Sequence, residues 1–85
     1  MEPILPFWFK QRQCKAEPAG ERTLRVTGPN LPEAFLRIEP VGDRWRGALR
    51  LTADGPAVSY TDPIFEEPKD AWDAAFELYR VRLIV

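Results

Sequence analysis

The sequence predicts an α+β domain, in which an antiparallel meander of about five β-strands is covered on one face by a single carboxy-terminal α-helix. Residues 44–52 alternate between apolar and polar side chains, which is typical of a half-buried strand. The stretch from Pro68 onwards instead places Trp72, Phe76 and Tyr79 at positions i, i+4 and i+7, on one side of a helix. Elsewhere glycine and proline separate short periodic runs, as in a sheet of short strands.

The length and composition are those of a small globular protein. The chain has 85 residues, 45% apolar and 29% charged, and we expect one domain over residues 1–85. No apolar run approaches the ~20 residues of a membrane helix, and the first six residues lack the basic and apolar regions of a signal peptide. These features favour a cytoplasmic protein, and the excess of arginine over lysine is common in bacteria with GC-rich genomes.

Five strands are expected before the helix. Gly20 suits the first of the turns between them, because glycine tolerates a positive φ, and the Asp54-Gly55 pair favours a tight hairpin. The predicted strands are residues 7–15, 22–27, 35–39, 44–52 and 57–61, and the predicted turns and loops are residues 17–21, 28–32 and 40–43.

Alternation within these strands predicts which side chains face the helix. We expect the aromatic rings of the helix to pack on Trp45, Leu49, Leu51, Val58 and Tyr60. The full set of inward positions is Leu24, Val26, Leu36, Ile38, Trp45, Gly47, Leu49, Leu51, Val58 and Tyr60.

The helix is expected to begin near Pro68, because proline lacks an N–H that the first helical position does not need. Its end is less defined, and residues 81–85 fit either a frayed helix or a short extra strand. Other residues widen its apolar stripe or crowd its start with acid, which the helix dipole favours: Ala71, Ala75, Leu78 and Leu83, and Glu66, Glu67, Asp70 and Asp73.

The net charge of −1 conceals an asymmetry along the chain. Residues 1–52 hold nine basic and six acidic side chains, whereas residues 53–85 hold three basic and seven acidic side chains. The sheet is therefore predicted to be basic and the helical end acidic.

Few residues could carry catalysis. The chain has no histidine, which excludes Ser-His-Asp and Cys-His chemistry and most zinc sites, and its single cysteine excludes an internal disulfide. Cys14 could be a thiol activated by Lys10 and Lys15, but we favour a small side chain in a strand. Ser59, the only serine, occupies an outward position of its predicted strand, where we expect it to have no chemical role. We predict that the protein is not an enzyme and has no cofactor.

An acidic cluster offers a second chemical interpretation. Asp62, Glu66, Glu67 and Asp70 could bind a magnesium or calcium ion through their carboxylate oxygens. Their spacing is not that of an EF-hand loop, and acidic residues at a helix start are explained by the helix dipole. We therefore predict no metal site.

A basic face of the sheet is the remaining functional hint. Arginines interleaved with aromatic rings could bind a protein partner or a second copy of the chain, and alternatively could stack nucleic-acid bases and neutralise phosphates. The alternative without a binding role is a solvent-exposed sheet face that is merely rich in arginine. The predicted face comprises Trp8, Lys10, Arg12, Arg25, Phe35, Arg37, Arg44, Arg46 and Arg50, with Glu39 as its only acid.

The segment from Arg44 to Tyr79 resembles the three-strands-then-helix layout of AP2-type and phage-integrase arm-binding domains, and of antitoxin domains of the HicB kind. Residues 44–46, 54–55 and 71–75 carry the resemblance, and no complete motif of these families is present. The resemblance implies an architecture and no particular function.

Overall fold

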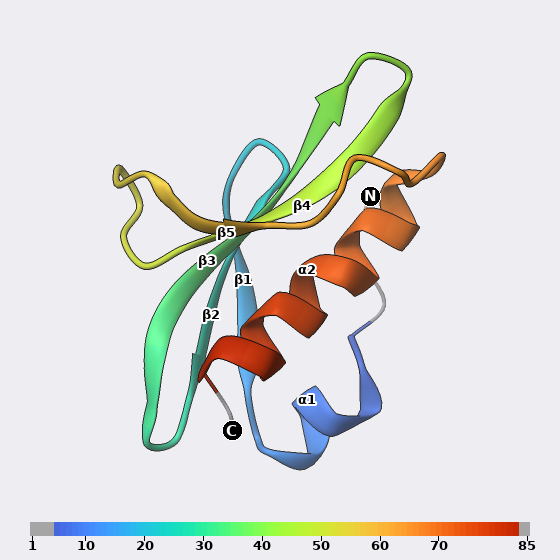
Figure 1. Ribbon diagram of the computed structural model, residues 1–85. Helices are drawn as coiled ribbons and strands as arrows, with labels where there is room; N and C mark the ends of the chain where they lie inside the picture. Colours follow the sequence, from blue (N-terminus) through green and yellow to red (C-terminus); the bar gives the residue numbers. More distant parts are fainter. Residues whose placement is uncertain (1–4, 84–85) are drawn as a thin grey trace.

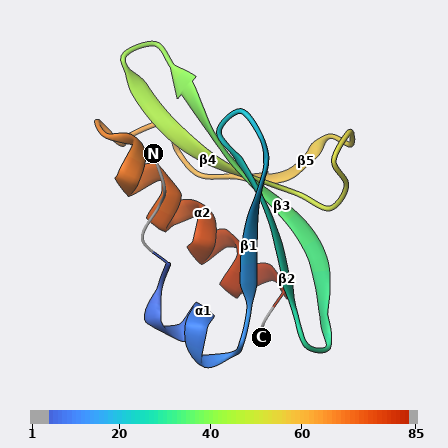
Figure 2. The same ribbon diagram turned by 180° about the vertical axis from the view of Figure 1, so that it is seen from behind.

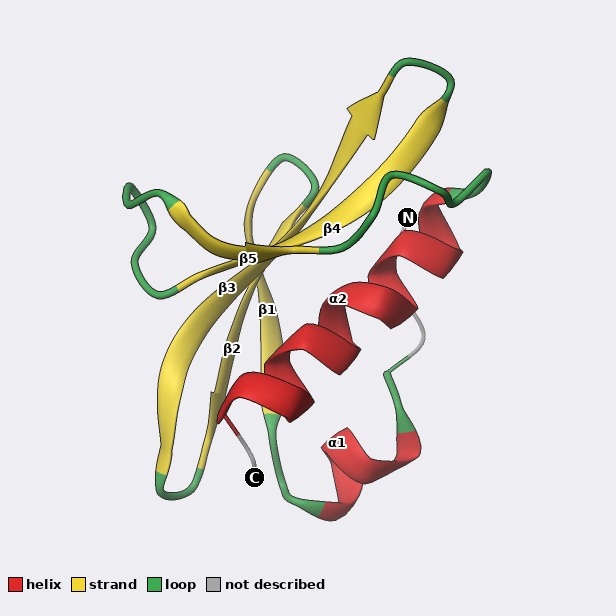
Figure 3. Cartoon of the chain, viewed as in Figure 1, coloured by secondary structure: helices red, strands yellow, loops and turns green. Residues whose placement is uncertain are grey.

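The computed structural model describes residues 5–83 and shows a five-stranded antiparallel sheet with both helices on one side (Figures 1 and 2). The strands lie in chain order, β1-β2-β3-β4-β5, so the predicted meander with a carboxy-terminal helix on one face is confirmed. The elements, coloured by type in Figure 3, are α1 (Phe7–Gln11), β1 (Lys15–Gly20), β2 (Thr23–Gly28), β3 (Leu31–Val41), β4 (Arg44–Arg50), β5 (Ala57–Tyr60) and α2 (Pro68–Leu83).

The pairing of β3 with β4 sets the two faces of the sheet. Its register is unbroken from Phe35 opposite Arg50 to Val41 opposite Arg44. Residues that face each other across a ladder share one side of the sheet. Leu36, Ile38, Gly47 and Leu49 are buried on the side of α2, together with Leu24 and Val26 of β2. Trp45 lies on the same side and packs against this core, as predicted.

Helix α2 begins at Pro68, as predicted, and buries its aromatic stripe against β3 and β4. Trp72 and Phe76 are buried, and so is Tyr79, whose hydroxyl donates to the Pro32 carbonyl oxygen at 3.4 Å. The sequence leaves residues 81–85 open between a frayed helix and a short strand. The helix continues through residues 81–83, and residues 84–85 lie outside the described residues. The side chain of Leu83 is likewise outside them.

The predicted first strand is wrong over residues 7–11, which form the short helix α1. The Pro6 carbonyl oxygen accepts hydrogen bonds from the N–H groups of Phe9 and Lys10, at 3.1 and 3.3 Å. The helix ends in a Schellman motif, in which the Gln13 N–H donates to the Lys10 carbonyl and the Cys14 N–H to the Phe9 carbonyl. Gln13 takes the left-handed conformation, with φ 60°, that glycine usually supplies at this position.

The first strand begins only at Lys15 and occupies most of the predicted turn at residues 17–21. The chain reverses just after it, where Gly20 has φ 138° and Arg22 has φ 53°. Gly20 therefore has the positive φ that we expected. The next reversal is also shorter than predicted, because Asn30 with φ 60° completes a tight turn and β3 starts at Leu31.

The fifth strand presents the opposite face from the predicted one. A register shift lies between Leu49 and Arg50, where the strand bulges, and Tyr60 pairs with Ala48 on the side away from α2. Tyr60 and Val58 are 49% and 41% exposed, so neither belongs to the core, and Leu51 lies beyond β4 and is 46% exposed. The predicted tight hairpin at Asp54-Gly55 is instead a longer connection over residues 51–56.

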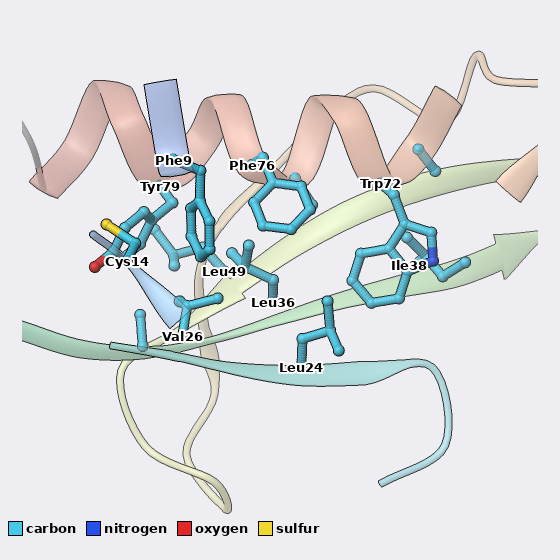
Figure 4. Close-up of a cluster of buried hydrophobic side chains, with 13 residues drawn as sticks. Phe9, Cys14, Leu24, Val26, Leu36, Ile38, Leu49, Trp72, Phe76 and Tyr79 are labelled. Atoms are coloured by element: carbon cyan, nitrogen blue, oxygen red, sulfur yellow. The ribbon is translucent and has the colours of Figure 1, made fainter. Parts of the chain in front are cut away.

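The helix α1 replaces these missing core residues with an aromatic ring. Phe9 is completely buried, and its ring lies 5.1 Å from that of Phe76 and 6.5 Å from that of Tyr79. Figure 4 shows this ring between α2 and the sheet, beside Cys14 and above Val26. The core is therefore closed at this end by the segment before β1.

We expect Phe9→Ala to lower the free energy of unfolding by about 3–5 kcal/mol, because it removes a buried ring and leaves a cavity. Phe7→Ala is the matched control, because Phe7 lies in the same short helix but is 76% exposed, and it should change stability by less than about 0.5 kcal/mol. Urea unfolding at equilibrium measures both. Equal effects of the two substitutions would contradict the packing of α1.

We expect Gly47→Ala to lower the free energy of unfolding by about 1–3 kcal/mol, because a methyl group there overpacks the contact between β4 and α2. It would lie 2.9 Å from the Ala75 Cβ atom and 3.0 Å from the Ala71 carbonyl oxygen. In an Ala75→Gly background the same substitution should cost less, which a double-mutant cycle by urea unfolding detects. Additive effects would place the helix further from the strand.

Candidate binding face of the sheet

The face of the sheet away from α2 carries four arginines in three rows that the strand register defines. The first row places Arg25, Phe35 and Arg50 side by side on β2, β3 and β4. The other rows join Arg37, Ala48 and Tyr60, and Glu39 with Arg46. We call this surface the arginine face, and it comprises Arg25, Phe35, Arg37, Glu39, Arg46, Ala48, Arg50 and Tyr60.

The floor of the arginine face is apolar and dry, although the described part of the chain places no second layer over it. Phe35 is only 7% exposed, and Ala48 is completely buried. Long arginine side chains cover such a floor with their methylene groups while the guanidinium heads remain near water. The Nε atoms of Arg37 and Arg50 are buried, and neither finds a hydrogen-bond partner among residues 5–83.

Most of the charge on this face is already balanced by carboxylates. Arg46 Nε donates to Glu39 Oε1 at 3.0 Å, and Arg37 Nε lies 3.6 Å from Glu39 Oε2. Glu33 Oε2 accepts from Arg25 Nε at 2.8 Å, and this hydrogen bond raises the pKa of the Arg25 guanidinium. The prediction that Glu39 is the only acid on this face is therefore wrong, because Glu33 also reaches it. Glu17, which lies opposite Arg25 on β1, is a third.

One corner of the arginine face is different, because it has an exposed aromatic ring beside an unbalanced charge. The guanidinium carbon of Arg46 lies 4.0 Å from the centroid of the Tyr60 ring, in a cation–π contact. Arg50 is a diagonal neighbour of Tyr60 and makes no ion pair within residues 5–83. Val58 adds an exposed apolar side chain on the same strand as Tyr60. We call Arg46, Arg50, Val58 and Tyr60 the Tyr60 corner.

The structure assembles only part of the face that the sequence predicted. Trp8, Lys10 and Arg12 lie in or just after α1, on the helix side of the sheet, so their assignment to a strand of the basic face is wrong. Trp8 packs edge-on against Phe9, with ring centroids 5.7 Å apart. The predicted residues that share the face are Arg25, Phe35, Arg37, Arg46 and Arg50.

Arg44 is drawn away from the arginine face by the segment after β5. Its Nη1 atom lies 3.3 Å from Glu66 Oε1 and donates to the Ile64 carbonyl oxygen at 3.4 Å. This segment follows the edge of β4, where Trp45 and Phe65 exchange backbone hydrogen bonds. Arg44 therefore braces a loop, and any binding role for it stays a prediction.

Tyr60 is absent from the predicted face, because unbroken alternation through β5 would turn its side chain towards the helix. A bulge reverses the faces on either side of it, and no single residue type marks this one. The proline and glycine at residues 55–56, just before β5, are the one local signal of an irregular strand entry.

The remaining candidates for catalysis or metal binding, Cys14 and the acidic residues, lie where they serve the structure of the protein. Cys14 is 8% exposed, and burial raises the pKa of its thiol, although Arg12 acts in the opposite direction. Beside it, residues Gln13, Lys15, Thr27, Gly28 and Pro29 line an open depression of about 400 Å³. Within residues 5–83 no group of three or more acidic or cysteine side chains could hold a metal ion, and no helix there is long and apolar enough to cross a membrane.

No protein-family model matches the chain, and comparisons with curated proteins and with solved structures likewise found no significant match.

We expect the Cys14 thiol to react with iodoacetamide about tenfold or more slowly in the folded protein than in urea, because burial limits access and favours the protonated thiol. The favoured protonated form also predicts a pH dependence. Because the pKa of the Cys14 thiol is higher in the folded protein than in the unfolded protein, the buried protonated thiol contributes to the free energy of unfolding at pH values below the pKa of the unfolded thiol. This contribution is lost as the pH rises through the folded pKa. Rapid alkylation of the folded protein at neutral pH would instead show an activated thiol.

Proposed function

We propose that this protein is a binding module, not an enzyme, and that its arginine face docks an acidic surface of a protein. The observation that supports this most directly is the Tyr60 corner. It combines a cation–π pair, an arginine without a carboxylate partner in the described chain, and an apolar floor. Arginine and tyrosine are enriched in protein interfaces and supply much of the binding energy there.

The geometry of the corner favours binding at a low entropic cost. Arg46 is held between Glu39 and the ring of Tyr60, so both side chains are ordered before a partner arrives. The Arg50 guanidinium can form two parallel hydrogen bonds with one carboxylate, which makes an aspartate or glutamate its natural partner.

The ion pairs on the arginine face weigh against nucleic acid as the partner. Arg25, Arg37 and Arg46 are each close to a carboxylate, and these carboxylates would repel phosphate groups. Nucleic-acid affinity derives mainly from the neutralisation of several phosphates by basic side chains. Among the arginines of this face, only Arg50 has no carboxylate partner within residues 5–83.

We expect a glutamate-rich peptide to shift the amide resonances of residues 45–50 and 57–60 in a nitrogen-15 correlation spectrum. Arg50→Gln should weaken binding by about tenfold, because a hydrogen bond to a charged group contributes about 1.5 kcal/mol or more. Arg82→Gln removes the same charge from the exposed end of α2 and serves as the control.

A single-stranded oligonucleotide is the second probe in the same titration. Shifts on the arginine face with the oligonucleotide alone would replace the proposal with nucleic-acid binding. An unchanged spectrum with both probes at low salt would remove both functions.

A further inference from the structure

The solvent-facing side of α2 is a second charged surface, and its sign is opposite to that of the Tyr60 corner. Asp70, Asp73 and Glu77 follow one another at helical spacing, and Glu66 and Glu67 precede them at the helix start. We call these five residues, with Ala74 between them, the acidic stripe. Glu77 is paired with Arg80 and Glu66 with Arg44.

Three members of this stripe have no ion-pair partner within residues 5–83: Glu67, Asp70 and Asp73. Glu67 and Asp73 are exposed, and Asp70 is half-buried. Arg50, on the other side of the molecule, is likewise unpaired in that part of the chain. One molecule cannot join these charges, because α2 packs on the face of the sheet opposite to the arginine face.

From this complementarity we infer that the acidic surface docked by the arginine face is the acidic stripe of a second copy of this chain. The inference rests on the proposed function and specifies its partner. The sheet of one copy would then be covered on both sides, by its own α2 and by the α2 of a neighbour.

The dimensions of the two surfaces agree. The stripe from Asp70 to Glu77 extends about 10 Å along the helix, and Arg46 and Arg50 lie about 14 Å apart along β4. Ala74 stands in the middle of the stripe, where a small side chain leaves room for the protruding ring of Tyr60. Asp73 would then meet Arg50.

Such a contact joins two different surfaces, so it does not close into a symmetric dimer but extends into open chains or into rings of three or more copies. Three turns of a helix cover less than the roughly 800 Å² per partner that stable interfaces bury. We therefore expect association only towards millimolar concentration, and we expect salt to weaken it because the contact is electrostatic.

Sedimentation of the full chain, at rising concentration and at low and high salt, tests the inference. The wild type should grow beyond a dimer at low salt, whereas Arg50→Glu and Asp73→Arg should each remain monomeric. An equimolar mixture of the two variants should again grow beyond a dimer, because each variant keeps one intact surface and the two reversed charges attract each other. Arg82→Glu and Asp43→Arg make the same charge changes at other exposed sites and should associate like the wild type.

A strictly monomeric wild type at millimolar concentration and low salt would overturn the inference. So would growth that stops at a dimer, or a mixture of the variants that stays monomeric. Urea unfolding of each variant shows that it is folded. The glutamate-rich peptide then separates the two proposals: if it still shifts the arginine face, the module binds a different acidic protein, and if it does not, the proposed function fails as well.

Discussion

The close approach of α2 to β4 at Gly47 is the constraint on which the rest of the structure depends. Because Gly47 has no side chain, the helix backbone lies almost directly on the strand there, opposite Ala71 and Ala75. The rings of Trp72 and Phe76, the residues that follow these two alanines in the helix, are buried between α2 and the sheet (Figure 4). The strand tolerates this close contact because both backbone polar groups of Gly47 form hydrogen bonds with Thr61, just after β5. The Thr61 N–H donates to the Gly47 carbonyl oxygen, and the Gly47 N–H donates to the Thr61 hydroxyl oxygen.

The same contact determines what the opposite face must carry. With Gly47 and Leu49 turned towards the helix, strand geometry turns Arg46, Ala48 and Arg50 away from it. The composition of the arginine face is thus coupled to the packing of the core. A shift of the β4 register by one residue would turn the core side chains of β4 towards solvent. The apolar floor beneath the arginines follows from the long paired strands β3 and β4.

The sequence predicts the parts of this structure in which local pattern and tertiary packing agree. These are the central strands, the inward Trp45 and the helix from Pro68 onwards. It fails at Phe9, because alternation over a short aromatic run fits a strand, and the deciding contacts come from residues almost 70 positions away. It fails at Tyr60, because a bulge reverses the alternation of faces along β5 and no single residue type marks this bulge. Glu33 lies between the predicted loop at residues 28–32 and the predicted strand at residues 35–39, so no face could be assigned to it and its ion pair with Arg25 could not be foreseen.

The edges of the sheet favour the proposed docking on a face over the addition of a strand at an edge. Strand β1 bears Lys15, Glu17 and Pro18, and charge and proline both discourage the addition of another strand. Strand β5 is short and bulged, which interrupts the row of backbone groups that an added strand would need. The arginine face lies between these two protected edges, with Phe35 and Ala48 as its apolar floor and Arg46 held between Glu39 and Tyr60. The proposed partner would meet this face with acidic side chains on a convex surface, which the solvent-facing side of an acidic helix provides.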